Sequence, residues 1–257
     1  MTVGADSDRL LAAVERSPEA AARHDRDAWV ALFTDDGRVV DPVGSRPHVG
    51  THELRRFFDT FIGPRDITFH RDVDIVSGHS VLRDLTLGIR MSASVSLAVP
   101  AILHYELRDV GPTPQIVALR AYWELPPMMW QFARTGVAAV PAGLALTRAL
   151  LSNQGLSGTA GFLSGVPAPR RRQRALLTAA LTALSVGDDL AIRRALSGVH
   201  LPEGFDQIRA RLRGAHWRRP LSAGRSAVAT VHAGDGALVL LADFTGSARI
   251  ERLQVFA

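Results

Sequence analysis

The chain has 257 residues, of which 47% are hydrophobic and 21% charged, a balance typical of a folded globular protein rather than a disordered one. It contains no cysteine, which excludes a disulfide scaffold and a thiolate metal site. The formal net charge of +5 comes from arginine spread along the chain, and with 6% aromatic residues this pattern favours a solvated surface over nucleic-acid binding.

The first third of the chain predicts three helices. Residues 6–24 have helical spacing of apolar positions, interrupted at Ser17-Pro18, where we expect a break because proline removes a helical hydrogen bond. Residues 27–33 continue as a second helix, and residues 52–58 form a third with an apolar face.

Between the second and third helices, Asp41 precedes a proline. We expect a turn at Asp35-Asp36-Gly37, then a short strand, then a second turn built on Pro42 and Gly44. Pro42 restricts the residue before it to extended geometry. Asp41 is therefore predicted to lie at the end of a strand, on a backbone that the following proline keeps rigid. The alternative is that this carboxylate only caps its own turn, as such residues commonly do.

From residue 66 to residue 124 the pattern changes to that of long antiparallel strands. On the strand within residues 95–108, Leu103 and Tyr105 share one face and His104 lies on the other. We expect the apolar face to line a pocket and His104 to lie on the outer face, as an interface residue. Helices followed by a strand meander predict an α+β fold.

The segment Ala31–Asp36, the Asp-Pro-Val-Gly sequence at residues 41–44 and the helix-like residues 53–58 resemble the bacterial ketosteroid isomerases. This family belongs to the wider NTF2-like (SnoaL-like) superfamily, whose fold is a bent antiparallel sheet wrapped by helices into a cone around an apolar pocket. The resemblance covers residues 14–124, and it implies that Asp41 is the general base of a proton transfer.

The family's two oxyanion donors are not matched. The resemblance places Ser17 where the family has a tyrosine and Leu103 where it has an acid. Losing one such donor costs on the order of a hundredfold to a thousandfold in rate. Tyr105, and Tyr122 on the next strand, are candidate replacement donors, although packing in the core is the alternative interpretation of both tyrosines.

The resemblance also implies an apolar ligand. The predicted binding residues are Phe33, Phe57, Phe58, Leu103, Tyr105, Tyr122 and Trp123, with Leu87, Ile89 and Met91 extending the apolar wall. No phosphate loop or dinucleotide fingerprint appears, and His48 and His52 straddle a glycine, so we assign neither a cofactor nor a metal.

We expect three regions: an NTF2-like domain at residues 1–125, an apolar connector at residues 126–169 and a second, degenerate NTF2-like domain at residues 170–257. The connector contains no acid and leads into Arg170-Arg171-Arg172. It is too interrupted to cross a membrane, but residues 126–172 suit contact with an anionic surface, and packing as a lid or linker is the alternative.

The second half repeats the order of three helices and then strands, and residues 185–196 resemble residues 22–33. It has no Asp-Pro-Val-Gly sequence. We expect it to act as a built-in partner in a pseudo-dimer, with a homodimer as the alternative.

The sequence leaves three functional hypotheses open. The chain is a carrier of a small apolar molecule, an enzyme that uses Asp41 in isomerisation, epoxide opening or cyclisation of a steroid, terpenoid or polyketide-like substrate, or an interaction module that docks through its central segment. The first residues show no basic segment followed by an apolar run, so we expect a cytoplasmic location, with peripheral membrane contact as the variant.

Overall fold

The computed structural model describes residues 2–138, 140–141, 143–145, 147–148, 152, 171–234, 236–246 and 249–257. The chain forms two compact units, Met1–Val166 and Pro167–Ala257, and each is described by itself. Among the described residues, no helix combines the length and the apolar character needed to cross a bilayer.

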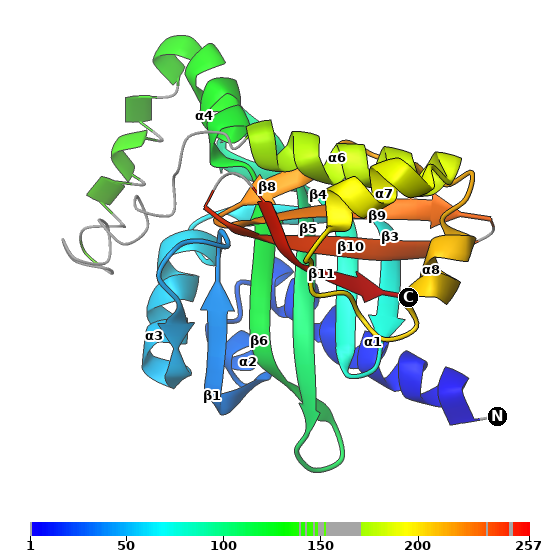
Figure 1. Cartoon of the computed structure of the whole chain (residues 1–257). Helices are drawn as coiled ribbons and strands as arrows, with labels where there is room; N and C mark the ends of the chain where they lie inside the picture. The colour runs from blue at the N-terminus through cyan, green and yellow to red at the C-terminus, as the bar shows by residue number, and fades with distance from the viewer. Residues whose placement is uncertain are drawn as a thin grey trace. The chain divides into compact units, whose positions relative to one another are not determined.

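The first unit consists of helices around one mixed sheet (Figure 1). Its helices are α1 (Thr2–Ala22), α2 (Arg26–Val30), α3 (Gly50–Phe57), the π-helical turn η1 (Phe58–Ile62), α4 (Leu125–Arg134) and the 3-10 turn η2 (Gly136–Ala138). Its strands are β1 (Phe33–Val40), β2 (His48–Val49), β3 (Asp66–Ser77), β4 (Ser80–Ser92), β5 (Val95–Asp109) and β6 (Pro114–Trp123).

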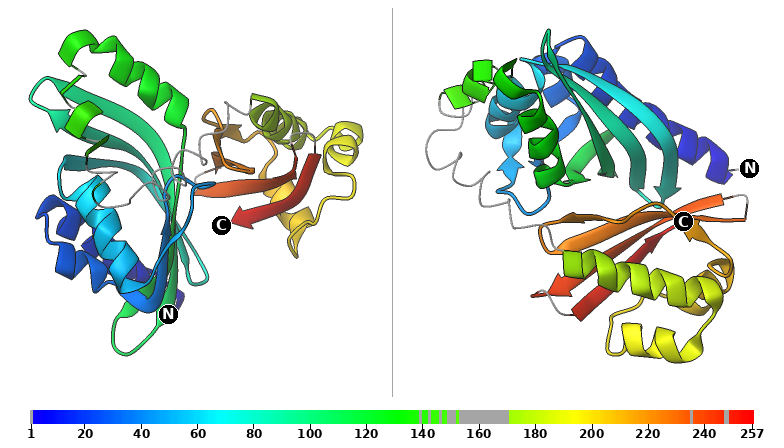
Figure 2. Two further views of the ribbon diagram at one scale, coloured as in Figure 1. Left: turned by 90° about the vertical axis from the view of Figure 1, so that its left-hand side faces the viewer. Right: turned by 90° about the horizontal axis from the view of Figure 1, so that it is seen from above.

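The sheet of the first unit has the order β2-β1-β6-β5-β4-β3, in which β1 and β6 are parallel and the other neighbours antiparallel. It is bent, and α1, α2, α3 and α4 all lie on one side of it (Figure 2). Alternate residues of β5, including Ala101, Leu103 and Tyr105, pack in the core on this side. This arrangement confirms the predicted α+β class.

Two local predictions were wrong. Helix α1 continues through Pro18, because its buried stripe of Leu10, Val14, Ser17 and Ala21 stabilises the helix more than the missing hydrogen bond destabilises it.

The expected turn at residues 35–37 is instead an irregularity within β1, where the pairing with β6 shifts between Phe33 and Arg38. A Cβ on Gly37 would lie 2.7 Å from the Thr34 carbonyl oxygen, so the chain requires glycine there to remain in the strand.

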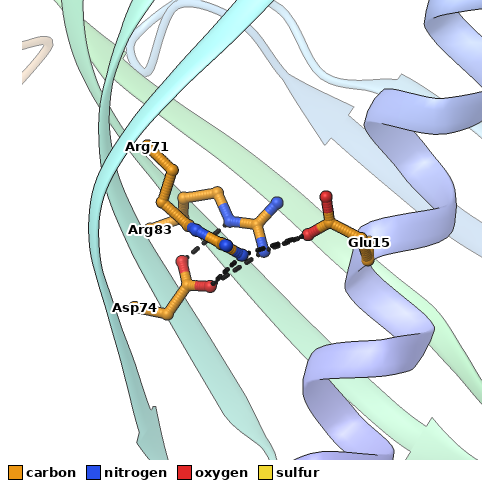
Figure 3. Close-up of polar contacts among 4 residues, drawn as sticks. All are labelled: Glu15, Arg71, Asp74 and Arg83. Carbon is orange, nitrogen blue, oxygen red and sulfur yellow. Dashed lines mark hydrogen bonds and ion pairs between the residues drawn. The ribbon is translucent and has the colours of Figure 1, made fainter.

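A buried ionic cluster ties α1 to the sheet (Figure 3). The guanidinium of Arg83 on β4 donates to both carboxylate oxygens of Asp74 on β3, at 2.7 and 2.9 Å, and to Glu15 on α1 at 2.8 Å. Arg71 lies at the edge of the same cluster, 3.3 Å from Asp74 and 3.4 Å from Glu15. Burial lowers the pKa of Arg83, but the hydrogen bond and charge of Asp74 outweigh burial and raise it.

The second unit also consists of helices and an antiparallel sheet. Its helices are α6 (Arg171–Val186), α7 (Asp189–Leu196) and α8 (Phe205–Arg211), and its strands are β7 (His216–Trp217), β8 (Leu221–Ala223), β9 (Ser226–Ala233), β10 (Gly236–Thr245) and β11 (Arg249–Phe256). The strand order is β11-β10-β9-β7, with β8 also paired to β9. Helix α6 packs its buried leucines on this sheet, so the unit has a core of its own.

Candidate active site

The first unit contains a mostly apolar cavity of about 120 Å³ at one end of its bent sheet. It is lined by Asp41, Phe57, Phe61, Ile62, Arg65, Ile67, Leu87, Ile89, Met91, Leu97, Val99, Trp123 and Met128. Asp41 and Arg65 are the two charged residues in this lining. A ligand larger than the cavity would enter by displacing flexible wall side chains such as Met91 and Met128.

Asp41 directly follows β1, and the turn after it is fixed to the neighbouring strand. The amide of Val43 donates to the carbonyl of Ala121 on β6 at 2.9 Å, and the amide of Ser45 donates to the carbonyl of Pro42 at 2.9 Å. Gly44 has φ of 100°, a conformation that favours glycine. These bonds hold the carboxylate-bearing residue against the sheet.

Trp123, at the end of β6, donates its indole N–H to Asp41 Oδ1 at 2.5 Å. Burial among apolar side chains raises the pKa of Asp41 to about 6, and the hydrogen bond from Trp123 lowers it against that effect. At neutral pH the carboxylate is therefore mainly ionised yet poorly solvated, which is the state required of a general base.

The predicted site residues lie in three places. Asp41, Phe57 and Trp123 lie along the cavity. Phe33, Phe58, Leu103 and Tyr105 are buried in the adjoining core, where Phe33 and Phe58 pack against Trp29. Tyr122 directly precedes Trp123 on β6, so its side chain lies on the opposite face of the sheet.

The positions expected to supply oxyanion donors do not reach the cavity. Ser17 Oγ accepts the indole N–H of Trp29 at 3.1 Å in the core, and Tyr105, whose hydroxyl interacts with Ser17, is 1% exposed. Burial raises the pKa of Tyr105 to about 12. The hydroxyls of Ser17 and Tyr105 are therefore not part of the cavity lining, and the side chain of Leu103 has no hydrogen-bond donor.

His104 lies on the opposite face of β5 from the core residues, as its place in the strand predicts. Its Nε2 is 3.1 Å from Ser80 Oγ. Among the described residues, no group of three or more histidines and carboxylates is arranged to hold a metal ion.

Sequence reasoning missed the part of the wall that comes from η1 and α4. Phe61 and Ile62 follow the expected third helix, which continues as a π-helical turn. Met128 reaches the cavity because the Gln131 amide bonds both the N–H and the C=O of Ala98 on β5, at 3.1 and 2.9 Å. The sequence does contain one indication of this contact. The stretch that begins at residue 126 lacks Asp and Glu, which is typical of a segment that packs on an apolar surface.

Comparison with known proteins identifies a family for part of the first unit. Residues 14–118 match the model of the SnoaL-like domain. Within the first unit, residues 14–118 are thus SnoaL-like. This match confirms the superfamily expected from the sequence.

Solved structures similar to the chain overlap about half of it. The Δ5-3-ketosteroid isomerase from a Mycobacterium species is 27% identical, with a TM-score of 0.42, over 46% of this chain and 95% of the isomerase. RV0760c from Mycobacterium tuberculosis is 25% identical, with a TM-score of 0.42, over 46% of this chain and 92% of that protein. An epoxide hydrolase from the same bacterium is 20% identical, with a TM-score of 0.44, over 52% of this chain and 96% of the hydrolase.

Proposed function

We propose that the SnoaL-like domain binds a small apolar molecule and moves a proton with Asp41 as the base. One observation carries this proposal: a carboxylate whose pKa is raised to about 6 lies in an apolar cavity and is held there by Trp123. A merely structural turn carboxylate would lie in water.

The chemistry suited to this site is ketosteroid-isomerase-type proton transfer. The carboxylate removes a proton from a carbon next to a carbonyl, the electron pair moves to the carbonyl oxygen, and the protonated Asp41 returns the proton to another carbon. Steroid, terpenoid and polyketide-like compounds have the apolar body and carbonyl groups that this reaction needs. The same base serves an epoxide-opening or cyclisation reaction.

Proton exchange tests the base directly. An unconjugated 3-keto steroid incubated in deuterium oxide is expected to gain deuterium beside its carbonyl with the wild-type protein, as measured by mass spectrometry. Asp41→Asn keeps the shape of the side chain and removes the base, so exchange should fall to the buffer rate. Asp36→Asn, an exposed carboxylate on the same strand, is the matched control. Equal exchange by Asp41→Asn and wild type would contradict the proposal.

A carrier without catalysis is the alternative, and the displaced donor positions favour it. If the domain is a carrier, the steroid binds to wild type and to Asp41→Asn, as read by tryptophan fluorescence, while neither protein accelerates exchange. Faster exchange by wild type than by Asp41→Asn would exclude this alternative.

A second candidate function is docking on a membrane through α4 and the turn after it. Met129, Trp130 and Val137 are 48%, 65% and 90% exposed, an unusual concentration of large apolar side chains at the surface. Flotation with vesicles containing phosphatidylserine tests this candidate. Wild type should float and Trp130→Ser should float less; no flotation at low salt would exclude it.

We further propose that the second unit is a degenerate copy of the first. In both units a residue with positive φ, His24 or Gly187, ends the first helix. The next residue, Asp25 or Asp188, then caps the second helix by accepting an amide N–H at 3.0 Å.

The remnant of a first strand also supports the repeat. His200 makes a parallel bridge with Arg252 on the last strand, the relation that β1 has with β6 in the first unit. The sequence Leu-Pro-Glu-Gly at residues 201–204 then corresponds to Asp-Pro-Val-Gly at residues 41–44. Leu201 stands at the position of Asp41, so the second unit carries no base there.

A further inference from the structure

Arg65 is an arginine whose position the proposed proton transfer does not explain. It lies between η1 and β3, lines the cavity and is 8% exposed. Nη1 donates to the backbone carbonyls of Thr60 and Phe61 at 2.6 and 3.0 Å, and Nε lies 3.2 Å from the sulfur of Met91. These bonds account for two of its three nitrogens.

No carboxylate pairs with Arg65 in the part of the chain that the structure describes. Its Nη2 likewise makes no hydrogen bond to a described residue. Burial lowers the pKa of Arg65, yet an arginine stays protonated at physiological pH. The wall of the apolar cavity therefore holds a positive charge that is neutralised only in part, by the carbonyl end of a helical turn.

Arg65 and Asp41 reach the cavity from opposite edges of the sheet. Asp41 follows β1 and Arg65 precedes β3, and three strands, β6, β5 and β4, separate them. At about 4.8 Å per strand spacing, four steps would span roughly 19 Å on a flat sheet, and the bend shortens this distance. Between them the lining is apolar, with residues such as Leu87 and Val99.

We propose that Arg65 is a specificity-determining residue that binds an anionic group at one end of an apolar ligand. A carboxylate or sulfonate there would supply the partner that the guanidinium lacks, through charge-assisted hydrogen bonds in a poorly solvated site. The preferred ligand class is then an amphipathic organic acid, with its reacting carbon near Asp41. This inference rests on the proposed ligand-binding role of the cavity.

A pair of fluorescent probes that differ in one group tests this role. 8-Anilinonaphthalene-1-sulfonate carries a sulfonate, and N-phenyl-1-naphthylamine is its uncharged counterpart. The measurement is the ratio of their dissociation constants at low salt. Wild type should bind the sulfonate at least as tightly as the neutral probe, although an apolar cavity without a cation would strongly favour the neutral one.

Arg65→Gln removes the charge while its amide can still donate to the carbonyls of Thr60 and Phe61. It should weaken the sulfonate about tenfold to a hundredfold and leave the neutral probe within about threefold. Arg65→Lys, which keeps the charge, should retain part of the preference. The matched control is Arg90→Gln, because Arg90 is an exposed arginine on β4 outside the cavity and should leave the ratio unchanged.

The possible results test the role of Arg65 and the existence of the ligand cavity separately. A wild type that binds the neutral probe tenfold more tightly than the sulfonate overturns the role of Arg65, as does an Arg65→Gln variant that loses both probes equally or neither. Failure of wild type to bind either probe overturns the proposed ligand cavity itself. Asp41→Asn should bind both probes, so loss of proton exchange in that variant leaves the role of Arg65 standing.

Discussion

Replacing Arg83 with methionine tests how much the buried ion pair at the centre of the ionic cluster stabilises the first unit. Arg83 is 2% exposed and makes three hydrogen bonds to carboxylates, two of them to Asp74. Methionine fills much of the same volume but leaves the Asp74 carboxylate, which is 11% exposed, with Arg71 at 3.3 Å as its cation. Removing one partner of a buried pair typically costs 3–5 kcal/mol, and because Arg71 compensates in part we expect about 3 kcal/mol.

The assay is urea unfolding of the full chain followed by tryptophan fluorescence, in which Trp29 is a reporter fully buried in the core of the first unit. Glu15→Gln measures the contact with α1 separately; because Glu15 is 45% exposed, this contact should contribute below about 1 kcal/mol, and most of the loss in Arg83→Met should come from the pair with Asp74. The double variant Asp74→Asn with Arg83→Met should recover part of the loss, because it removes both buried charges. A loss below about 1 kcal/mol in Arg83→Met would refute the reasoning that this buried ion pair stabilises the first unit.

Four further predictions concern the cavity. Because burial raises the pKa of Asp41 to about 6, proton exchange should rise with pH through about 6 and then level off. Folding favours the protonated carboxyl of Asp41. Its contribution to stability is therefore complete below the unfolded pKa near 3.8 and is lost as pH rises through the folded pKa of about 6. In thermal unfolding, Asp41→Asn should be more stable than wild type at pH 8 but not at pH 3.5. Trp123→Phe removes a hydrogen bond that lowers this pKa, so the exchange profile should shift to higher pH, and an unshifted midpoint would contradict the assignment. Gln131→Ala frees the backbone of Ala98, so α4 should detach and hydrogen exchange at Ala98 should rise at least tenfold, with unchanged protection counting against the anchoring role.

The sequence by itself determined the class of fold and the place of one carboxylate. Period-two apolar patterns from residue 66 onward specify the strands, because side chains on a strand alternate between its faces. The same alternation places Leu103 and His104 on opposite faces of β5. The proline and glycine around Asp41 specify its turn, because their backbone preferences are local.

Tertiary structure decided what surrounds that carboxylate. The helix through Pro18 and the strand through Gly37 run against local preference, because packing over many residues outweighs the propensity of one. The sequence offers no pattern that brings Trp123 to Asp41, 82 positions away, or that distinguishes Arg65 from other arginines. Contacts between distant strands, and the loss of water that shifts the pKa of Asp41, exist only once the sheet has formed and bent.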